Sequence, residues 1–161
     1  MALDYLLKID GIKGESTDKK HPDEIEIESF SWGATQSGTF AAGGGGGAGK
    51  VSFQDIHFTT KVNAASPNLM IACATGQHIK TAVLTVRKAG KDQQEYYTVK
   101  LSDTLVSSYQ SGGSEGSSSL PVDQFSLNFA KIEFEYKAQK ADGTLGAGVK
   151  GGWDLKQNVK I

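Results

Sequence analysis

The sequence predicts a mainly β fold: a closed barrel of two antiparallel sheets with one flanking α-helix and a long glycine-rich loop. Apolar and polar residues alternate along most of the chain, which is typical of strands with one dry face. Only the segment from Ser66 to Gly76 carries both helix start and helix stop signals. The glycine run from Gly43 to Gly47 separates two segments that are rich in β-branched and aromatic residues.

Chain length and charge limit the possible classes of protein. The 161 residues have the size of one ordinary domain, and we expect residues 1–161 to form it. The formal net charge is −1, with 17 basic and 18 acidic residues interleaved, so the chain has no basic footprint for nucleic acid. Cys73 is the single cysteine, which excludes an internal disulfide and any multi-cysteine metal site.

The segment from Glu24 to Trp32 changes the phase in which apolar and polar residues alternate. Ile25 and Ile27 place apolar side chains on odd positions, whereas Phe30 and Trp32 place them on even positions. One extra residue in a strand sends every later side chain to the other face, so a bulge near Glu28 would reconcile the two halves. Strands that bend in this way suit a closed or two-sheet β structure.

The other strands follow from the same alternation and from the turn signals between them. The segments from Val51 to Thr60 and from Val122 to Tyr136 repeat the phase change. We expect about eight strands in all. Besides the segment at 24–32, they are 3–9, 51–60, 82–88, 95–101, 104–109, 122–136 and 153–161. The segments 82–88 and 95–101 are expected to pair as a hairpin. The last segment, 153–161, is either an edge strand or a tail that docks on a neighbour.

The single helix is predicted from its end signals. Ser66 supplies an N-cap oxygen, Pro67 occupies the first helical position, and Gly76 adopts the left-handed conformation at the C-terminal end. We expect the face formed by Leu69, Met70 and Cys73 to pack on the barrel.

The glycine run resembles a phosphate-binding loop at first sight. Gly44, Gly49 and Lys50 fit the spacing of that motif. Val51, however, stands where the motif needs a hydroxyl, and a strand pattern follows where the motif needs a helix. We therefore expect a long arm that becomes ordered against another molecule, since polyglycine loses much conformational entropy on ordering.

No catalytic constellation is visible. The three histidines are not spaced as zinc ligands, and no nucleophile elbow is present. Glu24, Glu26 and Glu28 share a strand face, which we interpret as a solvated face rather than a general acid site. We expect no enzyme, no cofactor and no metal, although an active site assembled in three dimensions would leave no motif.

Exposed strand edges and the glycine arm favour a protein that assembles. An open edge is a liability unless it is covered, and the same edge of another subunit is one natural cover. The first ten residues lack the basic region and apolar core of a secretory signal, and no apolar stretch is long enough for a membrane span. The chain is therefore expected to begin as a cytoplasmic protein without membrane insertion.

Nine segments in a fixed order cover nearly the whole chain. They are LLKIDGIKGES, IESFSWGATQSG, GKVSFQDIHFTTKV, SPNLMIACATGQHI, AVLTVRKAG, QEYYTVKL, VSSYQSGG, FEYKAQKADG and GGWDL. This ordered set resembles the Hcp family, the tube proteins of bacterial type VI secretion systems. Asn63, where the family often has aspartate, and the extended GTLGAGVKGG depart from the pattern.

The resemblance implies hexameric rings that stack head to tail into a hollow tube. The tube would act with a spike protein and a contractile sheath, leave the cell without a cleaved signal peptide, and carry secreted effectors in its lumen. A tail tube protein of a related phage-type injection system is the alternative within this architecture. An enzyme or a monomeric carbohydrate-binding barrel is the opposing class, and native mass would separate it from a ring.

Two sites follow for an assembly of this kind. The resemblance assigns ring stacking to the loop with Thr39, Phe40, Gly43, Gly44, Gly45, Gly46, Gly47, Gly49 and Lys50. Ser31 alternates with Phe30 and Trp32 along a strand. If Phe30 and Trp32 point into the barrel, Ser31 therefore points out of it. In a ring such a face can line the central channel, and we expect Ser31 to belong to an effector-binding lumen.

Overall fold

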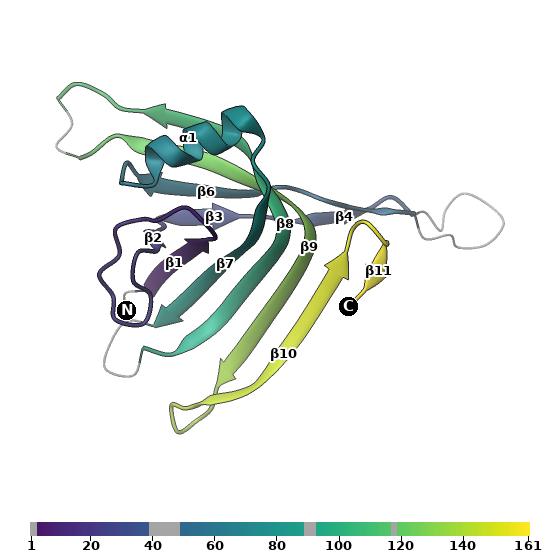
Figure 1. Cartoon of the computed structure of the whole chain (residues 1–161). Coiled ribbons are helices and arrows are strands. Elements are labelled where there is room, and N and C mark those ends of the chain that lie inside the picture. The colour runs from purple at the N-terminus through teal and green to yellow at the C-terminus, as the bar shows by residue number, and fades with distance from the viewer. Residues whose placement is uncertain (1–2, 39–48, 89–92, 117–118) are drawn as a thin grey trace.

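A computed structural model describes residues 3–38, 49–88, 93–116 and 119–161 (Figure 1). Eleven strands and one helix are present in this part of the chain. They are β1 Leu3–Ile9, β2 Ile25–Glu26, β3 Ser29–Ser31, β4 Ala34–Gln36, β5 Val51–Phe53, β6 Ile56–Lys61, α1 Ser66–Thr75, β7 Ile79–Lys88, β8 Glu95–Gly112, β9 Val122–Gln139, β10 Leu145–Asp154 and β11 Val159–Lys160. The predicted mainly β fold with one helix is confirmed.

The strands form a nine-stranded sheet and a separate two-stranded sheet of β4 and β5. The large sheet has the order β11-β10-β9-β8-β7-β1-β2, and β6 joins it by pairing with both β9 and β3. Strands β8 and β9 are 18 residues long each and run side by side through the whole molecule (Figure 1). The predicted strand at 104–109 is therefore the second half of β8, because the chain bends there without leaving the sheet.

The segment from β2 to β3 changes its strand partner where the phase of the alternation changes. Its first part pairs with β1, and Ile27 donates its N–H to the carbonyl of Tyr5 at 2.9 Å. The next residue, Glu28, donates to the carbonyl of Thr59 at 2.8 Å, and β3 then pairs with β6. The irregularity predicted near Glu28 is therefore present as a break between two short strands.

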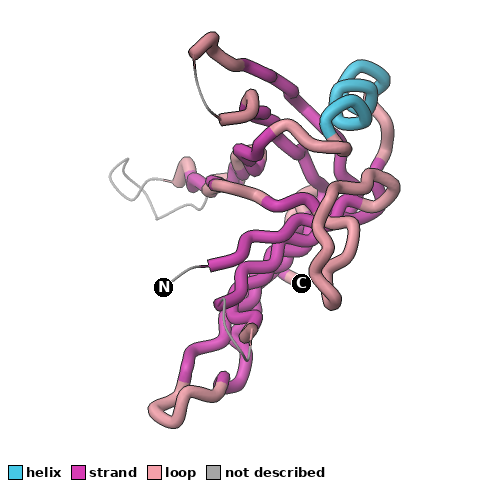
Figure 2. Tube along the Cα trace, turned by 90° about the vertical axis from the view of Figure 1, so that its left-hand side faces the viewer, coloured by secondary structure: helices cyan, strands magenta, loops and turns pink. Residues whose placement is uncertain are grey.

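The core lies inside the curve of the large sheet, to which β6 belongs, and the helix covers one end (Figures 1 and 2). Phe58 of β6 and Phe125 of β9 are 1% exposed each, and their rings stack with centroids 5.1 Å apart. Other fully buried large side chains are Leu7, Ile25, Ile56, Leu69, Ile79, Leu84, Leu101, Leu127, Val99 and Val106.

The helix begins at Ser66, the residue that was predicted to be its N-cap. Ala65 is the N-cap without a side-chain cap, Ser66 is the first helical residue, and Pro67 follows it. The Ser66 hydroxyl instead accepts from the N–H of Asn63 at 2.9 Å and donates to the carboxylate of Asp123, which is fully buried. A buried carboxylate needs hydrogen-bond donors, so the serine is held by tertiary contacts rather than by the helix start.

The predicted apolar face of the helix is wrong in one position. Leu69 and Ala72 are buried and Cys73 is half-buried against the core, whereas Met70 is 51% exposed. Met70 follows Leu69 by 100° around the helix axis, which turns it off the stripe of residues three and four apart that faces the sheet. Gly76 has the expected left-handed conformation, with φ +65°.

The glycine-rich stretch near the C-terminus is a strand rather than a loop. Strand β10 runs from Leu145 to Asp154 beside β9, and β11 pairs with its last two residues. Of the two alternatives left open for 153–161, the structure shows the edge strand: Trp153 and Asp154 end β10, and Val159–Lys160 forms β11 beside them. Strand β10 starts earlier than its alternation indicated. Glycines give no apolar alternation to read, so the sequence pattern begins only near Trp153.

Candidate assembly interface

The glycine-rich arm grows from a narrow ribbon. Strands β4 and β5 pair only with each other, through Ala34 with Phe53 and Gln36 with Val51, and the ribbon projects away from the large sheet (Figure 1). All three side chains of β4 are exposed. An isolated two-stranded ribbon is marginal in water, so this ribbon is suited to pairing or packing with another molecule.

The base of the arm argues against a phosphate-binding loop. Residues 39–48, with Thr39, Phe40 and the glycine run, lie outside the described residues. Gly49 lies so close to the opposite strand that a Cβ there would be 2.9 Å from the backbone nitrogen of Gly38. Lys50 is exposed and leads directly into strand β5, so no helix N-terminus follows it to bind phosphate.

Ser31 has the predicted orientation. It is exposed on β3 opposite His57 of β6, while Phe30 and Trp32 pack against the core. Trp32 donates its Nε1–H to the hydroxyl of Tyr97 at 3.1 Å, which fixes the indole inward. The alternation around Ser31 therefore does produce an outward polar face.

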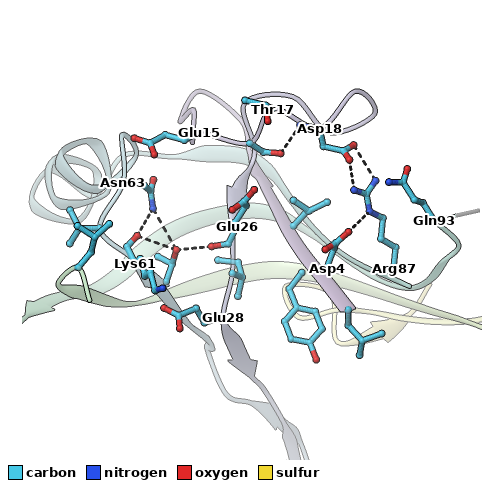
Figure 3. Close-up of a pocket in the computed structure, with 18 residues that line it drawn as sticks. Asp4, Glu15, Thr17, Asp18, Glu26, Glu28, Lys61, Asn63, Arg87 and Gln93 are labelled. Atoms are coloured by element: carbon cyan, nitrogen blue, oxygen red, sulfur yellow. Dashed lines mark hydrogen bonds and ion pairs between the residues drawn. The ribbon is translucent and has the colours of Figure 1, made fainter. Parts of the chain in front are cut away.

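A pocket of about 720 Å³ opens where β2 separates from β1 and faces β6 (Figure 3). We call it the β1 notch. Acidic side chains outnumber basic ones around it, and Leu3 and Leu120 add exposed apolar surface. It is lined by Leu3, Asp4, Tyr5, Leu6, Glu15, Ser16, Thr17, Asp18, Glu26, Ile27, Glu28, Thr60, Lys61, Val62, Asn63, Arg87, Gln93 and Leu120.

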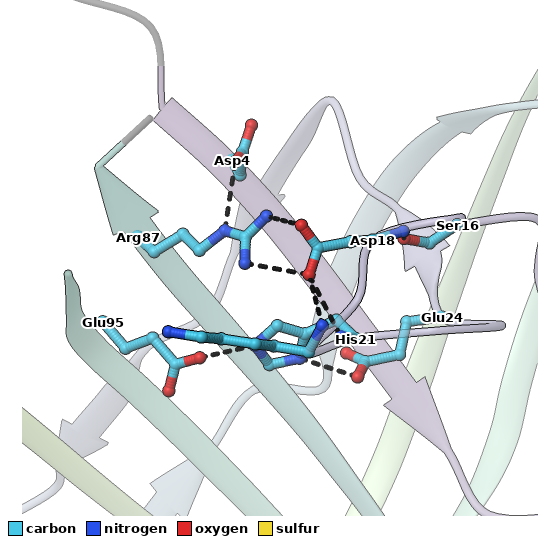
Figure 4. Close-up of polar contacts among 8 residues, drawn as sticks. Asp4, Ser16, Asp18, His21, Glu24, Arg87 and Glu95 are labelled. Atoms are coloured by element: carbon cyan, nitrogen blue, oxygen red, sulfur yellow. Dashed lines mark hydrogen bonds and ion pairs between the residues drawn. The ribbon is translucent and has the colours of Figure 1, made fainter. Parts of the chain in front are cut away.

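Two of the acidic side chains of the notch form ion pairs with Arg87 of β7, whose side chain is 3% exposed (Figure 4). Its Nε donates to Asp4 at 3.1 Å, and its two terminal nitrogens donate to the two carboxylate oxygens of Asp18. The hydrogen bond from Arg87 holds the pKa of Asp18 well below its ordinary value. This bidentate pair fastens the loop before β2 to the sheet.

His21 makes a second fastening next to the first. Its Nδ1 lies 2.7 Å from Glu24 and its Nε2 lies 2.5 Å from Glu95, at the start of β8 (Figure 4). Burial lowers the pKa of His21, but the hydrogen bonds to Glu95 and Glu24 outweigh it and raise the pKa above its ordinary value. Glu24 is buried by these contacts, so its predicted place on a solvated face is wrong, because the histidine covers it.

The opposite edge of the large sheet is basic and apolar. Val149, Val159 and Ile161 are exposed. Lys150, Lys156 and Lys160 are exposed beside them, and only Lys150 has a carboxylate within 4 Å among the described residues, Glu133 at 3.8 Å. We call residues 145–161 the β10–β11 edge.

The described residues contain no group of three or more histidine, cysteine, aspartate or glutamate side chains that could hold a metal ion. In the same part of the chain, no helix has the length and apolar character needed to cross a bilayer. Among the described residues, β4 and β5 pair with no further strand, and the two ends of the large sheet are open edges, so these features are suited to assembly.

Comparison with known proteins agrees with these features. Residues 6–136 match the family described as "Type VI secretion system effector, Hcp". Protein hcp1 of Pseudomonas aeruginosa is 49% identical over 162 residues, which cover 99% of both chains. The chain belongs to the Hcp family.

Solved structures of Hcp proteins share the fold. A type six secretion system protein superposes with a TM-score of 0.94 at 32% identity, over 99% of this chain and 100% of its own. Hcp1 from Salmonella typhimurium superposes with a TM-score of 0.81 at 34% identity over the full length of both chains. The resemblance found in the sequence is therefore confirmed, and this Hcp protein belongs to the type VI secretion system.

Sequence patterns could not place the polar contacts around the β1 notch of this Hcp protein. His21 and Glu95 are 74 residues apart, and Arg87 and Asp18 are 69 residues apart. Their juxtaposition depends on which strands are neighbours, and no local motif encodes it. The sequence offers one signal for these contacts: Arg87 follows apolar Val86 within a strand pattern. A charged side chain at such a position is buried in the structure, and a buried charge needs a partner.

We expect the His21 contacts to make stability depend on pH. The folded pKa of His21 is raised, so its contribution is fully present below the unfolded value of 6.5 and is lost as the pH rises through the folded pKa. Unfolding in urea at several pH values between about 6 and about 9 measures it. The stability advantage of the wild type over His21→Gln should shrink as the pH rises, and an advantage that grows would contradict the arrangement.

Proposed function

We propose that this Hcp protein is the structural subunit of a type VI secretion inner tube. Six copies form a ring, rings stack head to tail, and the hollow tube leaves the cell with effector proteins in its lumen. The observation that carries the proposal is the β4–β5 ribbon, which projects from the large sheet and pairs with no other strand among the described residues. The arm beyond it, from Thr39 to Lys50, contacts the adjacent ring.

The proposed partners and location follow from that role. The tube meets a spike protein at its tip and lies within a contractile sheath. The protein is cytoplasmic before the apparatus fires and afterwards reaches the extracellular space or a target cell, without a cleaved signal peptide. It is a structural component rather than an enzyme.

Native mass tests the proposal directly. Light scattering on the purified protein should give about six times the chain mass of 17.1 kDa, because the two uncovered edges of the sheet invite head-to-tail contacts that close into a ring. A monomer across the micromolar range would contradict the tube role and favour a monomeric binding protein.

Ser31 provides a test of the lumen. Its side chain is exposed, and a small polar residue on a channel wall lets an effector approach closely. Ser31→Gln adds bulk without burying a charge, so rings should persist while fewer effector molecules co-purify. Ser114→Gln, at an exposed position of the loop between β8 and β9, is the matched control. Equal effector recovery from wild type and Ser31→Gln rings would remove Ser31 from the lumen site.

A further inference from the structure

The loop before β2 has a stem and a tip that are held in different ways. Backbone hydrogen bonds join the two arms of the stem, among them the bond from the N–H of Gly14 to the carbonyl of Asp23 at 2.8 Å. Residues 17–22, which we call the loop tip, make no backbone hydrogen bond to a strand among the described residues. The tip contacts the sheet through the side chains of Asp18 and His21 (Figure 4).

These two anchors belong to one tight turn. Oδ1 of Asp18 accepts the backbone N–H of Lys20 at 2.9 Å and that of His21 at 3.1 Å. The same carboxylate accepts both terminal nitrogens of Arg87. Displacement of His21 from the sheet therefore also pulls on the carboxylate that Arg87 binds, so the two anchors hold or release the tip together.

The geometry around His21 requires a doubly protonated ring. Its Nδ1 faces Glu24 and its Nε2 faces Glu95, both at hydrogen-bond distance. A neutral imidazole can donate from one nitrogen only, and the lone pair of its other nitrogen would then face a carboxylate oxygen. Both contacts are favourable only for the imidazolium, and the raised pKa of His21 agrees with this requirement.

The charges packed around the tip are mostly acidic. Lys19 and Lys20 of the tip are exposed and have no carboxylate within 4 Å among the described residues, and Lys88 of β7 donates instead to Gln139. Loss of the proton from His21 would leave four carboxylates with Arg87 as their paired cation. These carboxylates are Asp18 and Glu24 of the loop, Asp4 of β1 and Glu95 of β8.

The tip covers a guanidinium that borders the β1 notch. Arg87 lines the notch together with Thr17 and Asp18 of the tip, yet its side chain is only 3% exposed (Figure 3). Asp18 occupies both of its terminal nitrogens. Movement of the tip away from the sheet would therefore widen the notch and expose Arg87 to solvent.

We propose that the loop tip is a pH-operated flap over Arg87. The flap is closed while His21 carries two ring protons, and it opens when His21 loses one of them, while the stem, the sheet and the core stay folded. Because closing raises the pKa of His21, closing is strongest at low pH and weakens as the pH rises through that raised pKa. The flap does not depend on the proposed tube role.

Arginine-selective labelling tests the flap, because Arg87 is the only arginine in the sequence. The wild type is treated with phenylglyoxal at several pH values between about 6 and about 9, and intact mass measures the labelling rate. Each rate is divided by the rate for N-acetylarginine amide under the same conditions, since the reagent itself reacts faster at high pH. The relative rate should rise by about tenfold or more over this range.

Two histidine variants separate the flap from a general effect of pH. Glutamine cannot provide charged donors to two carboxylates, so His21→Gln should label rapidly at every pH. His78→Gln removes a histidine that pairs with Asp103 elsewhere on the surface, and it should keep the wild-type profile. A wild-type relative rate that is independent of pH, or a His21→Gln rate that rises as in the wild type, would overturn the flap.

Hydrogen exchange in the wild type keeps the test valid if His21→Gln fails to fold. The protection of the backbone N–H groups of Lys20 and His21 should fall as the pH rises, since both bond to Asp18 within the tip. The protection of Leu84, which lies in β7 between β1 and β8, should stay unchanged. An equal loss of protection at all three residues would mean that the whole domain opens and would overturn a local flap.

Discussion

A chain in which the run from Gly43 to Gly47 is replaced by a two-residue Gly-Ser linker is expected to form single rings and no tubes. The ribbon at the base of the arm ends at the pair of Gln36 and Val51, so the replacement lies beyond every described hydrogen bond of the fold. Changes of this kind usually alter the free energy of unfolding by less than about 0.5 kcal/mol. The shorter arm, however, no longer spans the distance to the adjacent ring.

Electron microscopy of concentrated protein measures the tubes, and sedimentation measures the rings. A Gly-Ser-Gly-Ser-Gly replacement of the same run keeps the length of the arm and should retain stacking. Normal tubes from the shortened chain would contradict the stacking role. Tight ATP binding by the wild type, lost on Lys50→Ala, would instead restore the phosphate-loop interpretation that the strand after Lys50 argues against.

The largest loss of stability is expected from Phe58→Ala. Phe58 lies on β6, between β3 and β9, with its ring stacked on Phe125 in the centre of the core. Removal of a buried phenyl ring costs about 3–5 kcal/mol through lost burial and the cavity that remains. Because a domain has only about 5–15 kcal/mol in total, the variant should be largely depleted of folded rings at elevated temperature.

Urea unfolding at constant pH measures this loss. Phe58→Leu fills most of the space and should cost less than half as much. His57→Ala, at the neighbouring exposed position, should change the free energy of unfolding by less than about 0.5 kcal/mol. A small effect of Phe58→Ala would mean that β6 is not packed as described.

Local alternation was sufficient to predict the class of fold and most of its elements. The hairpin of β7 and β8, the irregularity at Glu28 and the inward direction of Phe30 and Trp32 all follow from which residues share a strand face. The pattern did not find β10, because glycines have no side chains that could mark a face. It also misassigned Ser66, whose hydroxyl is used by the distant Asp123.

The candidate interface was less accessible to sequence reasoning than the fold. Ser31 could be oriented from its neighbours, but the β1 notch depends on the separation of β2 from β1, which no periodicity records. Likewise, the alternating glutamates at 24–28 look equivalent in the sequence. Only the tertiary position of His21 distinguishes buried Glu24 from exposed Glu26 and Glu28.

The change of partner between Ile27 and Glu28 gives the molecule a seam. Strands β8 and β9 are joined by a long ladder of backbone hydrogen bonds. At the seam, by contrast, Ile27 makes one backbone hydrogen bond to Tyr5 of β1, and Glu28 makes one to Thr59 of β6. An outward pressure on the wall would separate these bonds before it disturbs the long ladder, since local opening begins where the fewest bonds must break. In the ring proposed above, we therefore expect each subunit to open first at this one place, before the ladder of β8 and β9 is disturbed.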